Sequence, residues 1–204
     1  MLALMTNLDA LFVKIFYSPE AAGNYGPVVT LERISLFLPW AVGLLLVPKV
    51  VQRKMAGRDP RPLLVLALAA ALAPGLAITG LYFLFPSAVV RLMFGSAYAD
   101  PGVVLGLAGL AASLYGGLNI WLNYAVSLKR HSFMFILACI LILQAAGMYL
   151  LGRDDLVQMS LATALAGLLG NLAGLLCTWS PDFPAVTASV PGRIDTLVKP
   201  EFEG

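Results

Sequence analysis

Three ionisable side chains near the start of the sequence could together bind an anion and carry a proton or a cation. They are Asp9, Glu32 and Arg33, and each lies within a predominantly apolar stretch. An arginine guanidinium presents a planar set of donors that matches a phosphate, and a carboxylate can take up a proton or a cation. Whether these groups can act together depends on the elements that carry them.

The composition is that of a membrane protein. Hydrophobic residues make up 60% of the 204 residues, charged residues make up only 12%, and the mean hydropathy is +0.87. A soluble domain has about a quarter of its residues charged. Cys139 and Cys177 each lie in an apolar run without a neighbouring His or Cys, so we expect them to serve packing rather than a disulfide or a metal site.

Hydropathy and turn residues divide the chain into six predicted transmembrane helices, an all-α integral membrane bundle. A helix needs about 20 mostly apolar residues to cross a hydrocarbon core of about 30 Å, where it satisfies its own backbone groups. The predicted helices span approximately residues 2–17, 25–48, 62–86, 102–128, 133–151 and 156–179. Together they form one membrane domain, residues 1–179, and the tail 180–204 is predicted to be mostly disordered because it is rich in proline and charge.

Basic residues are concentrated in alternate loops, which predicts the orientation of the chain. The loops on one side, with the tail, contain Lys49, Arg53, Lys54, Arg58, Arg61, Lys129, Arg130, Arg193 and Lys199. The loops on the other side contain only Arg91 and Arg153. By the positive-inside rule the first side is cytoplasmic, so the first helix runs outward and the C-terminus is cytoplasmic. Four aromatic residues fall near the predicted outer boundary: Tyr17, Tyr25, Tyr98 and Tyr149.

The first two predicted helices place the ionisable residues at one depth. Asp9 precedes the turn at Ser18 by nine residues, and Arg33 follows Asn24, on the other side of that turn, by nine residues. At 1.5 Å per residue both lie about 13 Å below the outer end of the antiparallel pair, and Glu32 lies at the same level. Two interpretations stay open. Either Asp9 and Arg33 neutralise each other and fix the packing, or Arg33 binds an anionic phosphate while a carboxylate takes up a proton or a cation.

A polar stripe runs along the fourth predicted helix. Tyr115, Asn119, Asn123 and Ser127 recur every four residues and so share one face, which we expect to lie against a cavity or a neighbouring helix. Asn119 and Asn123 are therefore candidates for substrate binding, with hydrogen bonding between packed helices as the alternative. Small residues that would let helices approach closely are Gly102, Gly106, Gly109, Ser113 and Gly117 in this helix and Gly170 and Gly174 in the sixth.

The sequence contains no recognisable catalytic or metal-binding motif. The only histidine, His131, follows two basic residues in a predicted loop, and there is no H-E-x-x-H, G-x-S-x-G or P-loop pattern. A membrane hydrolase or acyltransferase needs a nucleophile with a base, or a metal. We therefore expect a protein without enzymatic activity, catalytic residues, metal or cofactor, and without a nucleic-acid partner.

Several stretches carry a resemblance to a known family. TNLDALFVKIFYSPEAAGNYG, followed by ERISLFLPWAVGLLLVPKV, is similar to the seventh and eighth transmembrane helices of the bacterial oligosaccharide and polysaccharide flippases. LFPSAVVRLMFGSAYADPG and NIWLNYAVSLKRHSF follow in the order expected for that family. The resemblance covers about residues 5–179 and extends to the superfamily that also contains the multidrug and toxin extrusion transporters.

The resemblance implies one lobe of a two-lobe transporter in the bacterial inner membrane. Such a transporter would move a polyprenyl-pyrophosphate-linked oligosaccharide to the outer leaflet by alternating access, with Arg33 as a pyrophosphate ligand and Asp9 as an ion-coupling residue. Because one lobe provides only part of a cavity, the expected partners are membrane lipids and either a missing N-terminal six-helix lobe or a second copy. The alternatives are a drug or cation antiporter of the same superfamily and a noncatalytic scaffold of a glycan-assembly complex.

Overall fold

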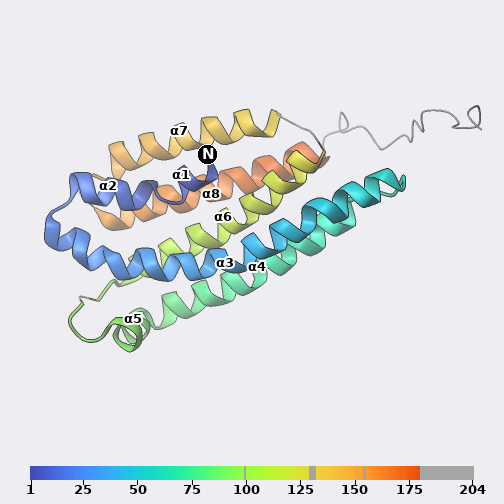
Figure 1. Cartoon of the computed structure of the whole chain (residues 1–204). Helices are drawn as coiled ribbons and strands as arrows, with labels where there is room; N and C mark the ends of the chain where they lie inside the picture. The colour runs from blue at the N-terminus through green and yellow to red at the C-terminus, as the bar shows by residue number, and fades with distance from the viewer. Residues whose placement is uncertain (99, 129–131, 154, 180–204) are drawn as a thin grey trace, which may run out of the picture.

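All regular secondary structure in the described part of the chain is α-helical. The computed structural model describes residues 1–98, 100–128, 132–153 and 155–179. Within these ranges there is no β-strand, and the helices are α1 (Leu2–Met5), α2 (Leu8–Phe16), α3 (Pro19–Met55), α4 (Arg61–Leu84), α5 (Pro86–Phe94), α6 (Val103–Ser127), α7 (Ser132–Leu151) and α8 (Leu156–Trp179). Figure 1 shows the long helices running side by side as a bundle. The predicted tail and the predicted loop residues 129–131 lie outside the described residues.

Five of the described helices are long and apolar enough to cross a membrane, namely α3, α4, α6, α7 and α8. The prediction of an all-α, multi-pass membrane protein agrees with this architecture. The first predicted span, residues 2–17, is not among the five, because the chain breaks at Thr6 and Asn7 into α1 and α2. Six transmembrane helices are therefore not confirmed.

The second predicted helix is longer than its hydropathy indicates. Residues 18–24, predicted as part of a break, form the start of α3 because Ser18 accepts a hydrogen bond from the Ala21 N–H and Pro19 occupies the first helical position. The helix ends at Met55, beyond the predicted end at residue 48, and at 1.5 Å per residue it is about 55 Å long. It continues through three internal prolines, Pro27, Pro39 and Pro48.

A short helix, α5, occupies part of the predicted break between the third and fourth spans. In Figure 1 it is seen nearly end-on at one end of the bundle, whereas the long helices run across the view. Val90 is buried against the bundle, while Leu92 and Met93 are exposed. The helix ends at Gly95, whose φ of 89° lies in the region that favours glycine. The break thus contains an ordered amphipathic segment.

The central helix of the bundle is α6, which packs against α3, α4 and α8. Glycines allow these close approaches. A Cβ atom at Gly116 would lie 2.5 Å from the Pro39 ring of α3, and one at Gly174 of α8 would lie 2.5 Å from the Trp121 ring of α6. The predicted seam of small residues is therefore a packing surface, except for Gly102, which precedes α6 with a φ of 53°.

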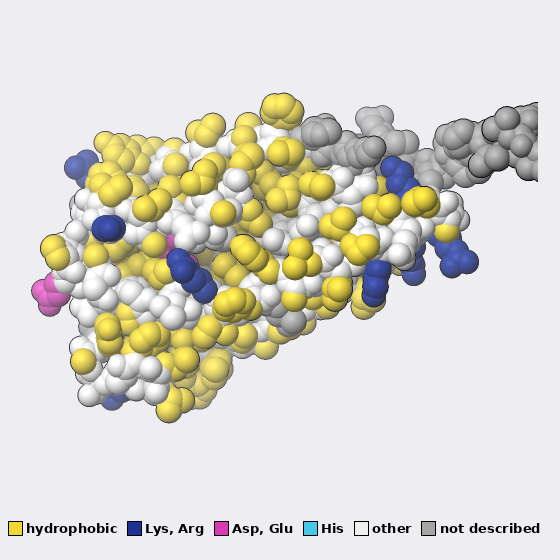
Figure 2. Space-filling model, in the orientation of Figure 1, with side chains coloured by type: hydrophobic (Ala, Val, Ile, Leu, Met, Phe, Trp, Pro, Cys, Tyr) yellow, Lys and Arg dark blue, Asp and Glu magenta, His cyan; other side chains and the backbone are white. Residues whose placement is uncertain are grey.

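One end of the bundle is strongly basic. The α3–α4 hairpin projects past the neighbouring helices at this end (Figure 1), and Figure 2 shows basic side chains gathered there, with apolar side chains covering the flanks. The exposed basic residues of the hairpin include Lys49, Arg53, Lys54 and Arg58. At the opposite end the Tyr17 hydroxyl donates a hydrogen bond to the Gly152 carbonyl, which joins the end of α2 to the α7–α8 turn.

Candidate functional site

Two carboxyl groups meet inside the bundle. Asp9 on α2 is only 3% exposed and Glu32 on α3 only 6%. Asp9 shares the inward face of its helix with Phe12 and Val13, since residues three and four apart lie on one side of a helix. The two carboxyl groups line a cavity of about 10 Å³, which has space for about one water molecule. The other lining residues are Thr6, Leu36, Ala111, Ala112, Tyr115 and Thr163.

Hydrogen bonds connect the carboxyl pair to its surroundings. The Tyr25 hydroxyl donates to Asp9 Oδ2 at 2.8 Å, and Asp9 and Glu32 line the same small cavity. The Tyr115 hydroxyl, in the same cavity, donates to the Thr163 carbonyl at 3.2 Å. Because two neighbouring buried carboxylates repel each other, this arrangement favours a pair that shares one proton.

Arg33 lies on the outside of the bundle, apart from the carboxyl pair. Its guanidinium is exposed and donates from Nη2 to Asn7 Oδ1 at 3.0 Å. The expected contact between Asp9 and Arg33 is therefore replaced by two separate contacts, because the Asp9 side chain turns toward Tyr25 and into the cavity that it shares with Glu32. Consecutive residues of an α-helix point about 100° apart. With Glu32 directed into the core, Arg33 is directed to the surface.

The break between α1 and α2 lies beside the carboxyl pair. Helical hydrogen bonding is interrupted at Thr6 and Asn7, and the Ala3 carbonyl accepts bonds from Thr6 Oγ1 at 3.3 Å and from Asn7 Nδ2 at 2.7 Å. The Met5 carbonyl accepts a bond from Gln144 Nε2 of α7 at 3.0 Å. Side chains thus replace the missing backbone donors. Non-helical backbone at membrane depth is tolerated only where it is enclosed in this way.

The structure places the candidates Asn119 and Asn123 away from the carboxyl pair. They lie one and two turns along α6 from Tyr115, and Asn123 Nδ2 donates to Asn119 O at 2.8 Å and to Asn119 Oδ1 at 2.7 Å. Both amides face α3 at Gly43, where an added Cβ would lie 2.7 Å from Asn123 Nδ2. The two amides thus lie against α3 and bond to each other within α6, and the substrate-binding and interhelical interpretations of the two residues both stay predictions.

Two residues of the site are missed by sequence reasoning. Tyr25 is predicted to lie at the outer boundary of the membrane, but it is buried and bonded to Asp9. It precedes Glu32 by seven residues, or two helical turns, so the shared face could have indicated its position. Thr163 carries no comparable signal, because its place in the cavity depends on how α8 packs against α6.

The arrangement has an interior part and an exterior part with different chemistry. The interior carboxyl pair can hold a proton or a small cation, and the exterior guanidinium can bind an anion. Within the described ranges, no three or more His, Cys, Asp or Glu residues are grouped as metal ligands. No protein-family model, curated protein or solved structure matches this chain. The resemblance to the flippases stays a prediction from the sequence.

Proposed function

We propose that the chain forms one lobe of a transporter that moves a polyprenyl-pyrophosphate-linked oligosaccharide to the outer leaflet of a bacterial inner membrane. The observation that carries the proposal is the Asp9–Glu32 pair, buried beside a broken helix. Ionisable groups are costly within a membrane bundle, so their burial favours a functional role. Discontinuous helices are common at the ion and substrate sites of secondary transporters, where unwound backbone faces the ion.

In this proposal Asp9 and Glu32 couple transport to an ion. Loss of the shared proton would leave two neighbouring anions in the cavity. Their repulsion would favour either the separation of α2 from α3 or the entry of a cation between them. The proton or cation occupancy of the pair would then change the relative populations of two conformations, which alternating access requires. The cavity of about 10 Å³ suits one occupant of the size of a water molecule.

Arg33 serves in this proposal as the ligand of the pyrophosphate. Its guanidinium is exposed, and its contact with Asn7 holds it beside the α1–α2 break. An arginine at this depth would be costly against lipid, with insertion scales giving about 2.5–3.5 kcal/mol. Cover by a second lobe or a second copy would remove that cost and would place Arg33 on the wall of a shared cavity. The exposure of Arg33 therefore supports the proposed partner.

The distribution of charge supports the proposed orientation. The hairpin between α3 and α4 carries exposed basic residues at one end of the bundle. Cytoplasmic loops carry the excess of Lys and Arg in membrane proteins, so this end is assigned to the cytoplasm. Because α8 ends on the same side as that hairpin, the C-terminus would also be cytoplasmic (Figure 1).

A drug or cation antiporter of the same superfamily is the second candidate. The feature that favours it is the excess of acidic over basic groups in the interior, where Asp9 and Glu32 are buried while Arg33 is outside. A cationic substrate would compete with the proton for the carboxyl pair and would not bind Arg33. Transport by a flippase should therefore depend on Arg33, whereas transport by an antiporter should not.

Leaflet-specific labelling of lipid-linked glycan in cells that carry the complete gene tests the proposal. Arg33→Gln should reduce the transbilayer movement of the glycan at least tenfold, because it removes the charge that pairs with the pyrophosphate. Glu32→Gln should make the remaining movement insensitive to the ion gradient. Folded protein in the membrane is measured for each variant, so that a loss of transport is separated from a loss of folding.

Lys14→Gln is the matched control, because Lys14 is also an exposed cation of the α2–α3 region. It should transport as the unaltered protein does. Normal glycan movement in Arg33→Gln would contradict the flippase function, and the antiporter would be favoured if Glu32→Gln alone abolished cation efflux. Equal loss of transport and of folded protein in both variants would show that the cluster serves packing.

A further inference from the structure

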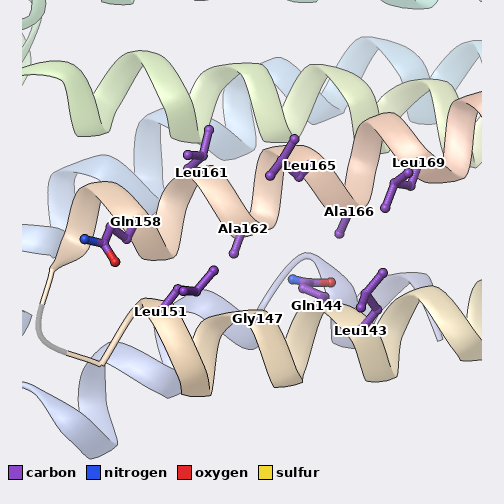
Figure 3. A pocket seen from close by; sticks show the side chains of 10 residues that line it. All are labelled: Leu143, Gln144, Gly147, Leu151, Gln158, Leu161, Ala162, Leu165, Ala166 and Leu169. Carbon is purple, nitrogen blue, oxygen red and sulfur yellow. The ribbon is translucent and has the colours of Figure 1, made fainter.

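The basic hairpin between α3 and α4 differs in its chemistry from the flanks of the bundle. On one flank a groove of about 410 Å³ between α7 and α8 is lined mostly by leucine and alanine (Figure 3), and lipid chains in general can occupy it. From Lys49 to Arg61, by contrast, the chain contains five basic residues and one acidic residue. That residue, Asp59, accepts the Arg61 N–H at 3.0 Å and can neutralise at most one cation. The hairpin therefore carries a charge that selects its occupant.

Two backbone hydrogen bonds close the end of α3 at the tip of the hairpin. The Gly57 N–H donates to the Lys54 carbonyl at 3.1 Å, and the Arg58 N–H donates to the Arg53 carbonyl at 2.9 Å. Gly57 has a φ of 67°, in the region that favours glycine. These features define a Schellman motif, in which the chain turns back over the last turn of the helix. The motif fixes Arg58 beside Arg53.

Arg53 and Arg58 occupy the two positions at which a Schellman motif frequently has an apolar contact. In such motifs the residue after the left-handed glycine packs against the residue five positions earlier in the helix. Here both residues are arginine, and both are exposed. Neighbouring like charges destabilise the folded state, whereas an anion placed between two guanidinium groups forms charge-assisted hydrogen bonds with both. The tip of the hairpin is therefore suited to an anion.

Lys49 places a third cation one turn away along α3. It lies four residues before Arg53, so the two share one side of the helix and differ in depth by about 6 Å. The headgroup layer on each side of a hydrocarbon core is about 5–8 Å thick. The apolar part of α4 begins at Leu63, two residues after Arg61. The basic groups therefore lie at the level of the lipid phosphates.

Exposed apolar side chains at the same end favour a lipid over a soluble anion or an acidic protein. Met55, in the last turn of α3, is 84% exposed, and Leu66 on α4 is 66% exposed. In water these side chains would add unfavourable apolar surface, whereas at a membrane interface they contact acyl chains. One lipid can offer its phosphate to the arginines and its chains to these residues.

We infer that the tip of the α3–α4 hairpin binds the phosphate of an anionic phospholipid, held between Arg53 and Arg58. Lys49 adds positive charge on the side of the hydrocarbon. The lipid belongs to the leaflet at this end of the bundle, whichever side of the membrane that is. The inference is independent of the proposed transport function, since it uses neither the carboxyl pair nor Arg33.

Lipid retention by the complete protein tests the inference. The protein is purified in an uncharged detergent and incubated with equal amounts of dioleoylphosphatidylglycerol and dioleoylphosphatidylcholine, which differ only in the headgroup. Native mass spectrometry then measures the lipid that stays bound. We expect about a 25-fold preference for phosphatidylglycerol, because each of the two arginines contributes about fivefold, the factor that about 1 kcal/mol provides.

Single variants locate the site within the hairpin. Arg53→Gln and Arg58→Gln should each lower the preference about fivefold. Lys54→Gln is the matched control in the hairpin, because it removes the same charge from the position next to Arg53, which points about 100° away. Lys14→Gln, on α2, is the control far from the hairpin. Both controls should change the preference little. All four altered side chains are exposed, so the variants should fold.

Thermal unfolding in the same detergent provides a second readout. Without lipid, Arg58→Gln should raise the Tm, because it removes the repulsion between the two arginines, and Lys14→Gln should not. Added phosphatidylglycerol should raise the Tm of the unaltered protein more than that of Arg58→Gln, since a ligand stabilises the state that binds it. Inorganic phosphate at the same concentration should raise neither, because it has no chains to contact Met55 and Leu66.

Three results would overturn the inference. Equal retention of the two lipids by the unaltered protein would show that the hairpin does not select an anionic headgroup. A loss of preference in Lys54→Gln as large as that in Arg58→Gln would show that the charge of the hairpin acts diffusely, without a site between the two arginines. Equal stabilisation by inorganic phosphate and by phosphatidylglycerol would show that the tip binds a free anion rather than a lipid.

Discussion

The helices α6 and α7 show opposite relations between hydropathy and burial. The most apolar window of α6 has a mean hydropathy of 1.7 and is 72% buried, whereas that of α7 has a mean hydropathy of 2.3 and is only 22% buried. In a soluble protein the more apolar helix would be the more buried one. Here the more apolar helix lies on the flank, because lipid tails solvate Leu and Ile as well as a protein interior does.

Packing rather than hydropathy therefore distinguishes the centre of this bundle. α6 carries small residues that let α3, α4 and α8 approach. Its Ser113 hydroxyl lies 3.0 Å from that of Thr79 on α4, and its Leu114 carbonyl accepts a hydrogen bond from Asn171 Nδ2 of α8. The outward face of α7 is formed by large apolar side chains, among them Phe135, Ile142 and Leu150. We therefore expect a given substitution to lower the free energy of unfolding strongly when it lies at a contact of α6, and only slightly when it lies on the outward face of α7.

The largest expected loss of stability follows from placing a leucine where α8 contacts α6. Gly174→Leu places side-chain atoms where even a Cβ would lie 2.5 Å from the Trp121 ring, so the two helices must separate. We expect a loss of about 3 kcal/mol, the upper part of the range for overpacking. Ala146→Leu, at an exposed position of α7, is the control and should change stability little. Unfolding in detergent measures both, and equal losses would contradict the comparison.

A buried leucine of α6 should contribute more to the free energy of unfolding than an exposed leucine of α7. Leu118→Ala removes a fully buried side chain, and Leu150→Ala removes an exposed one. Because lipid tails are as apolar as leucine, the first change loses mainly packing contacts, and we expect about 2 kcal/mol. The second should cost less than about 0.5 kcal/mol. The difference between the two unfolding free energies is the quantity to measure, and its absence would show that α6 is not the centre of stability.

A hydrogen bond between α4 and α6 should contribute less than either packing contact. The hydroxyls of Thr79 and Ser113 lie 3.0 Å apart, and each also lies within hydrogen-bond distance of a carbonyl of its own helix. Since a hydroxyl has one hydrogen, one of the two donates across to the other helix while the second donates within its own. Ser113→Ala should cost about 0.6 kcal/mol, the average for such bonds between membrane helices. A double-mutant cycle with Thr79→Val isolates the bond. A coupling energy of zero would show that the two hydroxyls bond only within their own helices.

The smallest expected change in stability depends on pH and comes from the loop before α6. The Ser87 hydroxyl and the Gly102 N–H donate to the Asp100 carboxylate, and they hold its pKa below the usual value of 3.8. A carboxyl group with a lowered pKa in the folded state stabilises that state above its unfolded pKa, and the stabilisation is lost as the pH falls through the folded pKa. Ser87→Ala should reduce this acid sensitivity slightly. Unfolding measured from neutral pH down to below pH 3.8 tests the effect, and identical curves would refute it.

The sequence predicts distances along the helices better than directions around them. Depth arithmetic brings Asp9 and Glu32 to one level, and the structure places both in one cavity. The direction of Arg33 was not predictable in the same way, because hydropathy varies too little around α3 to show which face is inward. The break at Thr6 and Asn7 depends on Gln144, 139 residues beyond the Met5 carbonyl that it supports. No local pattern contains that contact.

The length of α3 determines how the bundle would respond to bilayers of different thickness. Lys49 follows Glu32 by seventeen residues, or about 25 Å, and its ammonium must stay among the headgroups. The basic hairpin therefore fixes the depth of Glu32 relative to one leaflet only. In a thicker bilayer the added hydrocarbon would accumulate on the opposite side, between Glu32 and the water beyond Tyr17. In the proposed transport function, proton access to Glu32 from that side would then become slower, while access from the basic side would be unchanged.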